Sequence, residues 1–350
     1  MPDERLFETV GVIHIHSNYS DGTKTIEEIA EIGAAAGLDY LMFTDHMTLQ
    51  PLRDGLQRFH KNVAVIIGYE IEDARNENHY LAFGIEKELP AGMNAKEYVD
   101  SVREMGGLGI IAHPDEVRNA IPEYPSYPWT EWGVEGFDAI EIWNHMSAWM
   151  ELLKRINVIK MILTPRRGLR GPTSRVLAKW DELARFRKLA GVGSADVHAH
   201  AYRKGPLKVT IFPYKVQFRS IRTHLLLKEP LSAEFGHARK QIFETIRSCR
   251  LFVSNYRRGD ARGFKFYARQ GEMIYQMGED IPLAPGLEMI MTAPKTASIR
   301  IIFNGDIIHN FNAASFQVAI TEPGLYRTEL LRHNRGWIYT NHLRIRKAEG

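Results

Sequence analysis

The chain is poor in cysteine, since Cys249 is the only one among its 350 residues. A single thiol excludes an internal disulfide and any zinc site built from several cysteines. The sequence also has no apolar run approaching the ~20 residues that a bilayer crossing needs, and no apolar region follows a basic one near the N-terminus. We therefore expect a cytoplasmic location and no membrane partner.

Neither sign of charge is in large excess. The chain has 45 Lys and Arg against 42 Asp and Glu, a formal net charge of +3. This balance does not predict a non-specific nucleic-acid coat, so no obligatory nucleic-acid partner is expected. Histidine, in contrast, is plentiful, with 14 residues. With one thiol in the chain, any metal ion would be bound by imidazole and carboxylate groups.

Short β-rich runs alternate with amphipathic segments up to about residue 215. A helix is expected over residues 25–36, where Thr25 is a suitable N-cap and Glu28 follows three residues later, and another over 94–105. This alternation indicates an α/β domain with a mainly parallel sheet. The expected strands cover residues 9–15, 40–44, 63–68, 80–84, 108–112, 138–142 and 191–194.

One connection is too short for a parallel pair of strands. Only about eight residues separate Glu70 from His79, whereas a parallel crossover needs a dozen or more. We therefore predict that the strands around 63–70 and 79–84 are antiparallel. This arrangement would return His79 to the end of the sheet that carries Glu70.

Past residue 215 the pattern changes to a helix over 236–249 followed mainly by strands. Asn304-Gly305 lies between two apolar runs and predicts a hairpin turn. The turn spacing is typical of a β-sandwich. Strands are expected over residues 263–268, 288–292, 298–303, 306–311 and 337–344. We therefore divide the chain into an α/β domain (1–225), a helical connection (226–260) and a smaller β-domain (261–350).

Histidines and carboxylates follow nearly every predicted strand of the first domain. They are His14 and His16, Asp45 and His46, Glu70, His113, Asn144 and His145, and Asp196 and His198, with Asp21 in a turn after the first strand. The carboxyl ends of parallel strands form one functional edge, so these side chains should converge. Burying so many of them without a compensating cation would be very costly. The sequence therefore predicts a site for divalent metal ions.

These motifs resemble the PHP (polymerase and histidinol phosphatase) superfamily of metal-dependent phosphoesterases. They occur in the family order over roughly residues 10–200. The stretches are His14-Ile15-His16-Ser17, Ser20-Asp21-Gly22-Thr23, Thr44-Asp45-His46, Gly68-Tyr69-Glu70, His79, residues 106–114 with His113-Pro114, and Gly193-Ser194-Ala195-Asp196-Val197-His198. The resemblance implies a distorted (β/α)7 barrel in residues 1–225. Residues 263–350 resemble the β-sandwich that follows some bacterial PHP domains.

The resemblance also implies a centre of two or three divalent metal ions, with Mn, Fe or Zn as the candidates. Its ligand sets would be His14, His16, Glu70 and Asp196 for one ion, Asp21, His46 and His198 for a second, and Glu70, His79 and His113 for a third. Asp45 is expected to orient a neighbouring ligand.

The expected activity is hydrolysis of a phosphate mono- or diester, on a phosphorylated small molecule or a nucleotide. A hydroxide bridging two metal ions would be the nucleophile. The expected catalytic residues are Asp21, His46, Asp196 and His198, and the expected substrate contacts are Arg166, Arg167, Arg170 and His145. Two alternatives stay open: an amidohydrolase-type enzyme that cleaves C–N bonds at the same site, and a binding protein whose C-terminal sandwich carries the function. The oligomeric state is not predicted.

Overall fold

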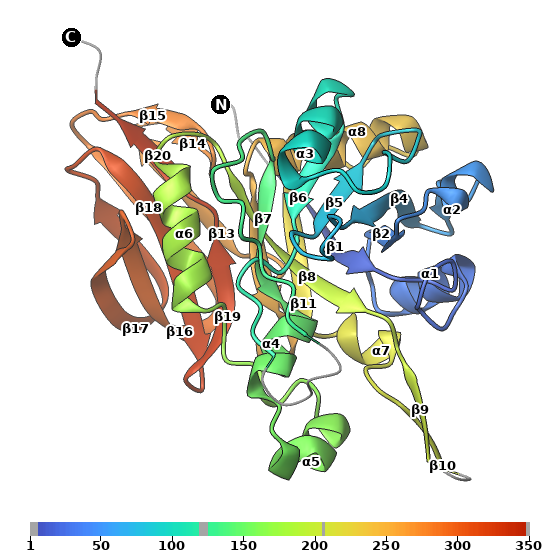
Figure 1. Ribbon diagram of the computed structural model, residues 1–350. Coiled ribbons are helices and arrows are strands. Elements are labelled where there is room, and N and C mark those ends of the chain that lie inside the picture. Colours follow the sequence, from blue (N-terminus) through green and yellow to red (C-terminus); the bar gives the residue numbers. More distant parts are fainter. Residues whose placement is uncertain (1–5, 119–124, 205–206, 348–350) are drawn as a thin grey trace.

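A computed structural model describes residues 6–118, 125–204 and 207–347, and its first half is a closed β-barrel (Figure 1). The barrel strands, in order around the wall, are β1 (Phe7–Ile15), β2 (Tyr40–His46), β4 (Val63–Ile71), β5 (Tyr80–Phe83), β6 (Leu108–Ile111), β7 (Ala139–Asn144) and β8 (Ala190–Val197), which pairs again with β1. Every neighbouring pair is parallel except those of β5, which runs antiparallel to both β4 and β6. The predicted barrel and the predicted antiparallel pair are confirmed.

Helices cover the outside of the barrel and begin where the sequence indicates. Thr25 and Asn94 cap the first two long helices, and each forms a capping box with a glutamate three residues later. The longer helices are α1 (Ile26–Ala35), α3 (Ala95–Glu104), α4 (His145–Leu152), α6 (Ser174–Ala184) and α8 (Phe235–Arg247). The short elements are α2 (Gln50–Arg53), β3 (Phe59–His60), η1 (Arg155–Asn157), α5 (Val158–Leu163), β9 (Ala201–Lys204), β10 (Leu207–Thr210) and α7 (Tyr214–Gln217). None of the helices described is long and apolar enough to cross a membrane.

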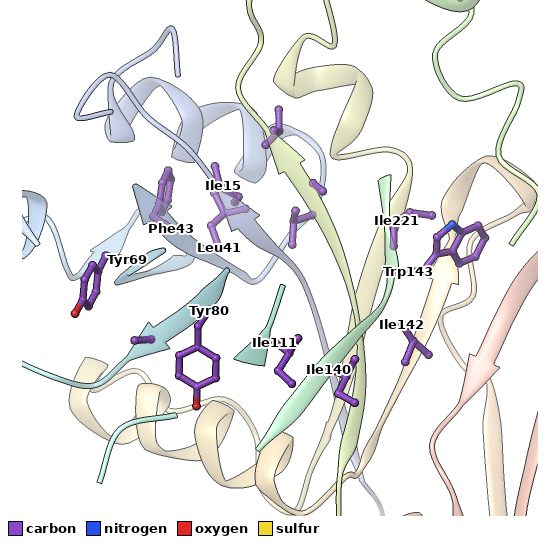
Figure 2. Close-up of a cluster of buried hydrophobic side chains, with 14 of the residues drawn as sticks. Ile15, Leu41, Phe43, Tyr69, Tyr80, Ile111, Ile140, Ile142, Trp143 and Ile221 are labelled. Carbon is purple, nitrogen blue, oxygen red and sulfur yellow. The ribbon is translucent and has the colours of Figure 1, made fainter. Parts of the chain in front are cut away.

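The barrel has two apolar cores because successive residues of a strand point to opposite faces. In β2, Leu41 and Phe43 belong to the cluster that packs under the surrounding helices, part of which Figure 2 shows. Tyr40 and Met42 belong to the other cluster, which fills the barrel and includes residues of α8. Because α8 packs its Phe243 against Phe83 at the start of the parallel strands, the opposite end of the barrel is left for polar side chains.

The C-terminal strands continue the barrel sheet. β11 (Ile221–Leu227) pairs antiparallel with β1, and β12 (Leu251–Asn255) pairs with both β11 and β19. The remaining elements are η2 (Tyr256–Arg258), β13 (Lys265–Gln270), β14 (Met273–Tyr275), β15 (Asp280–Pro282), β16 (Leu287–Phe303), β17 (Asp306–Ala319), β18 (Gly324–Arg332), β19 (Arg335–Thr340) and β20 (Leu343–Arg346). These strands enclose a separate apolar core that includes the buried Trp337. The division of the chain at residues 225 and 260 stays a prediction.

Some C-terminal strands differ from the sequence-based expectation. The hairpin at Asn304-Gly305 is confirmed, since Phe303 pairs with Asp306 across it. The runs 288–292 and 298–303, however, belong to the single long strand β16, whose pairing with β17 shifts register between them. The run 337–344 is divided between β19 and β20, and β18 was not expected at all.

A buried ionic network joins α6 to the C-terminal strands. Arg327 of β18 donates two hydrogen bonds of 2.8 Å to the Asp181 carboxylate and a third, of 2.7 Å, to Glu329. His342, between β19 and β20, contacts the same Asp181 at 2.7 Å. Arg327 and Glu329 of β18 are therefore buried, which explains why the sequence of this strand does not look like that of a core strand.

Candidate metal centre

All nine predicted metal ligands lie together at the end of the barrel where the parallel strands finish. Their ligand atoms form four overlapping groups, and within each group the atoms lie within 4.8 Å of one another. The groups are His16, Asp21, His46 and His198; His14, His16 and Glu70; His14, His113 and Asp196; and Glu70, His79 and His113. Residues almost 200 positions apart in the sequence thus share one cluster.

Glu70, at the end of β4, lies at the middle of the cluster and is 1% exposed. Its Oε2 atom is 3.1 Å from His14 Nε2, 3.3 Å from His16 Nε2 and 3.5 Å from His46 Nδ1. One carboxylate oxygen is therefore shared by three imidazoles from β1 and β2.

The other oxygen of Glu70 faces a second pair of imidazoles. Its Oε1 atom is 2.7 Å from His79 Nδ1 and 3.2 Å from His113 Nε2. His79 reaches this position because β5 returns antiparallel to β4. The two oxygens of Glu70 thus connect two subsets of histidines, as expected for a carboxylate that bridges two cations.

The aspartates complete the other side of the cluster. Asp196 Oδ1 lies 3.5 Å from His198 Nδ1, 3.6 Å from His14 Nε2 and 3.7 Å from His16 Nε2. Asp21 Oδ1 lies 3.3 Å from His198 Nε2 and is the most exposed of these groups, at 46% of its side chain. Asp21 therefore lies where the cluster meets solvent.

The backbone at three of these positions has an unusual conformation. His14, His113 and Asp196 have φ angles of 67°, 27° and 51°, which residues other than glycine rarely adopt. At His14 the pairing of β1 with both β2 and β8 shifts register, so a bulge re-aims the side chain. Such strain is stored where a site requires a particular side-chain direction.

Four of the histidines share one pattern: one ring nitrogen faces the cluster and the other contacts an oxygen outside it. The outer contacts are His14 Nδ1 with Glu141 Oε1 (2.8 Å), His79 Nε2 with Asn76 Oδ1 (3.0 Å), His113 Nδ1 with the Tyr127 carbonyl (3.2 Å) and His198 Nδ1 with the Asp196 carbonyl (3.2 Å). An N–H on the outer nitrogen leaves the lone pair of the inner nitrogen for a cation, which is the usual arrangement of metal-binding histidines.

The sequence did not indicate Glu141, which lies in the middle of β7 and is 1% exposed. Its Oε1 atom contacts His14, and its Oε2 atom accepts hydrogen bonds of 2.8 Å from the His113 amide and from Asn144 Nδ2. The signal that could have indicated Glu141 is a single carboxylate inside an otherwise apolar strand. Glu141 therefore holds both the His14 ring and the backbone of His113 in position.

Asp45 holds the loop that carries Asp21, in keeping with its expected orienting role. It accepts hydrogen bonds of 2.7 Å from the Ser17 amide, the Ser17 hydroxyl and the Ser20 hydroxyl. Asp45 is buried, so these contacts define the position of the loop rather than a surface interaction.

The charges of the cluster perturb one another strongly. Burial disfavours the charged form of Glu70, but His14, His46 and His79 outweigh burial and lower its pKa well below the ordinary value. Burial likewise opposes protonation of His113, but its contact with Glu70 raises the pKa of this histidine to about 9. Burial and the neighbouring His198 and His46 lower the pKa of His16 instead.

The donor set fits divalent cations. His16 is 0% exposed, and neither of its ring nitrogens has a hydrogen-bond partner among the described residues. Buried imidazole nitrogens without partners are costly, and a coordinated cation would satisfy one of the two. Imidazole together with carboxylate suits Zn, Mn and Fe.

The predicted substrate contacts are not part of this cluster. Arg167 and Arg170 are exposed, and Arg166 donates to the Arg219 carbonyl at 2.9 Å. His145 is fully buried, with its ring 5.7 Å from that of Phe212, and burial lowers its pKa to about 4. The predicted contacts of these four residues with substrate stay predictions.

A different guanidinium lies beside the cluster. Arg118 lies over the Tyr127 ring at 5.2 Å, and that ring stacks on His79 at 4.9 Å. Arg118 also pairs with the buried Glu116 at 2.8 Å, and its Nε atom is buried without a partner among the described residues. No pattern in the sequence indicated Arg118, which follows the His113-Pro114 motif as a single charge.

Three comparisons relate the chain to known proteins. The uncharacterized protein MJ1587 of Methanocaldococcus jannaschii is 27% identical over 117 residues, which cover 29% of this chain and 66% of that protein. A phosphoribosyl 1,2-cyclic phosphate 1,2-diphosphodiesterase of Eggerthella lenta is 32% identical over 85 residues, covering 23% of this chain and 32% of that enzyme. The chain thus spans less than two thirds of either relative.

The chain is also similar to a solved two-domain structure from Bacteroides vulgatus, which is described as containing a predicted PHP-like metal-dependent phosphoesterase. The TM-score is 0.47 at 13% identity, and the alignment covers 97% of this chain and 96% of the solved chain. The family model of the PHP domain matches residues 13–117, which include seven of the nine clustered side chains; Asp196 and His198 lie beyond it. This match covers less than a third of the chain, and together with the barrel that carries the cluster it supports the PHP superfamily.

Proposed function

We propose that the protein is a metal-dependent phosphoesterase acting on a phosphorylated small molecule or a nucleotide. The observation that carries the proposal is the Glu70 carboxylate, whose two oxygens face five inward-turned imidazoles. This donor set supports two or three divalent ions, and it lies at the functional end of the barrel.

The proposed ligand sets overlap with the four groups of side chains, but only the third set coincides with one of them. His14, His16, Glu70 and Asp196 would hold one ion, Asp21, His46 and His198 a second, and Glu70, His79 and His113 a third. Divalent ions in such sites lower the pKa of water and neutralise phosphate charge.

The residues of the chain have separate tasks in this proposal. Glu70 connects the subsets, Glu141 holds the His14 ring, and Asp45 fixes the loop of Asp21. Asp21 lies at the solvent-exposed side, where a substrate would enter, and we assign catalytic importance to it together with His46, Asp196 and His198. We further propose that Arg118 binds a phosphate oxygen, since a guanidinium suits that group and its Nε atom has no partner in the part of the chain that the structure describes.

The mono- or diester preference is part of the proposal that the experiment must decide. We would load the protein with Mn, Fe or Zn and measure phosphate release from a panel of mono- and diesters, with and without a chelator. Hydrolysis should disappear with the chelator and in Glu70→Gln, but not in Glu86→Gln, which alters an exposed carboxylate outside the cluster. Ester panels that stay intact under all three metals would refute the proposal, and turnover of amides instead would favour the C–N hydrolase alternative. We keep the cytoplasm as the proposed location.

A further inference from the structure

The segment of η1 and α5 carries a stripe of apolar side chains that no described residue covers. Ile156, Ile159 and Leu163 are 94%, 76% and 74% exposed. Their spacing of three and four residues places them on one face of the consecutive helical turns. Figure 1 shows α5 projecting beyond α4 at the lower edge of the molecule. Adjacent large apolar side chains at such exposure mark an interaction site.

The opposite face of the same segment is firmly attached to the protein. Met161 is 7% exposed and packs with Trp149 and Phe212, and the Trp149 indole donates to the Met161 carbonyl at 3.1 Å. Asn157 also donates to the Leu152 carbonyl at 2.9 Å. A helix that is apolar on both faces is normally buried on both. Because the inner face is already packed, the outer stripe is left for an occupant that is not among the described residues of this chain.

The charges around the stripe select that occupant. Residues 152–180 contain eight Lys and Arg and no Asp or Glu. Lys154, Arg155 and Lys160 border the stripe, are exposed, and form no ion pair with any residue the structure describes. A second copy of the chain packed on this face across a two-fold axis would bring like charges together. The occupant is therefore anionic as well as apolar.

The basic surface continues past the stripe. Arg166 follows Leu163 by three residues and contacts the Arg219 carbonyl. Burial and the guanidiniums of Arg257 and Arg219 lower the pKa of Arg166, and none of these three arginines forms an ion pair with a residue that the structure describes. Such a surface offers contacts to several phosphate groups at once.

We propose that Ile156, Ile159 and Leu163 insert into the headgroup region of an anionic phospholipid membrane, while the surrounding Lys and Arg side chains contact lipid phosphates. A short apolar stripe framed by basic residues is the signature of a protein that lies on a membrane rather than crossing it. This proposal departs from the expectation of no membrane partner, which was drawn from the absence of long apolar runs in the sequence. The anionic cytoplasmic leaflet is the surface that a protein of the cytoplasm would meet.

Co-sedimentation of the full chain with vesicles tests the proposal. Vesicles of phosphatidylcholine and phosphatidylglycerol in equal parts should bind the protein, and vesicles of phosphatidylcholine alone should bind it far more weakly. The double variant Ile156→Ser/Ile159→Ser should lose at least ~10-fold in binding because apolar insertion is removed. Arg155→Gln/Lys160→Gln should lose roughly fivefold per charge.

Matched controls use equally exposed residues elsewhere. Phe186→Ser removes an apolar side chain that is 83% exposed, and Arg185→Gln removes an exposed arginine, both between α6 and β8. Neither control should change binding. Absence of binding to the anionic vesicles, or equal losses in the controls and the double variants, would overturn the proposal. So would a concentration-dependent dimer that only Ile156→Ser/Ile159→Ser abolishes, since it would assign the stripe to a second copy.

Discussion

Replacing Glu141 by glutamine tests whether the carboxylate of β7 organises the metal centre. Glu141 accepts from His14 on one oxygen and from the His113 amide and Asn144 on the other, all at 2.8 Å. Glutamine has the same shape but only one acceptor oxygen. Its NH₂ group must therefore face either the His14 N–H or the two donors on the other side, and at least one of these contacts becomes a clash of donors.

The magnitude follows from these contacts. Loss of the outer partner of a metal-binding histidine typically costs 10–100-fold in metal affinity or activity, which corresponds to about 1.4–2.7 kcal/mol. A buried donor left without an acceptor adds about 1–3 kcal/mol of lost folding stability. We therefore expect Glu141→Gln to bind metal at least ~10-fold more weakly and to unfold more easily even without metal.

A double-mutant cycle identifies how Glu141 acts. Metal affinity would be measured by competition with a chromophoric chelator in Glu141→Gln, in His14→Ala and in the double variant, with the exposed Glu135→Gln as the matched control. If Glu141 acts through His14, its substitution should cost little affinity once His14 is gone. Wild-type affinity in Glu141→Gln, or full additivity with His14→Ala, would refute the reasoning.

Three further outcomes are expected. Asp21→Ala should lower turnover by at least ~100-fold because it removes the carboxylate whose oxygen lies 3.3 Å from His198, and excess Mn should restore part of the activity, as assayed by phosphate release. Arg327→Met should lower the free energy of unfolding by about 3–5 kcal/mol in urea titrations, because it removes the buried guanidinium that Asp181 and Glu329 share. Burial opposes ionisation of Asp181, but Arg327 and His342 lower its pKa to about 2. A lowered carboxylate pKa stabilises the folded state above the unfolded pKa, so about 2 kcal/mol should be lost as the pH falls from about 4 towards 2, and Asp181→Asn should lack this loss.

Much of the barrel and its cluster could be predicted because strand ends are visible in sequence. The short connection before His79 indicated an antiparallel strand, and the structure places that histidine against Glu70 as expected. The periodicity of apolar residues, however, predicts only which residues share one face of a strand or helix. The bulge and positive φ at His14, which aim its ring, depend on pairing with β2 and β8 and have no local signal.

Residues whose role depends on a distant partner were missed for the same reason. Glu141 and Arg118 each appear as single charges without a pattern, and their meaning comes from His14 and Tyr127. In β18, Arg327 and Glu329 hide the pattern of a buried strand, because the charge of Arg327 is compensated by Asp181 of α6 as well as by Glu329. Long-range pairing of charges is a tertiary property that a single sequence does not display.

The unbroken sheet from β1 through β11 and β12 to β19 has a mechanical consequence. Two units joined by a flexible linker are free to pivot, and such motion often opens and closes an active site. Here a pivot would have to break the hydrogen bonds that β12 makes with β11 on one side and β19 on the other. The two units should therefore tumble as one rigid body, and a twist applied to the C-terminal strands would reach β1, the strand that carries His14.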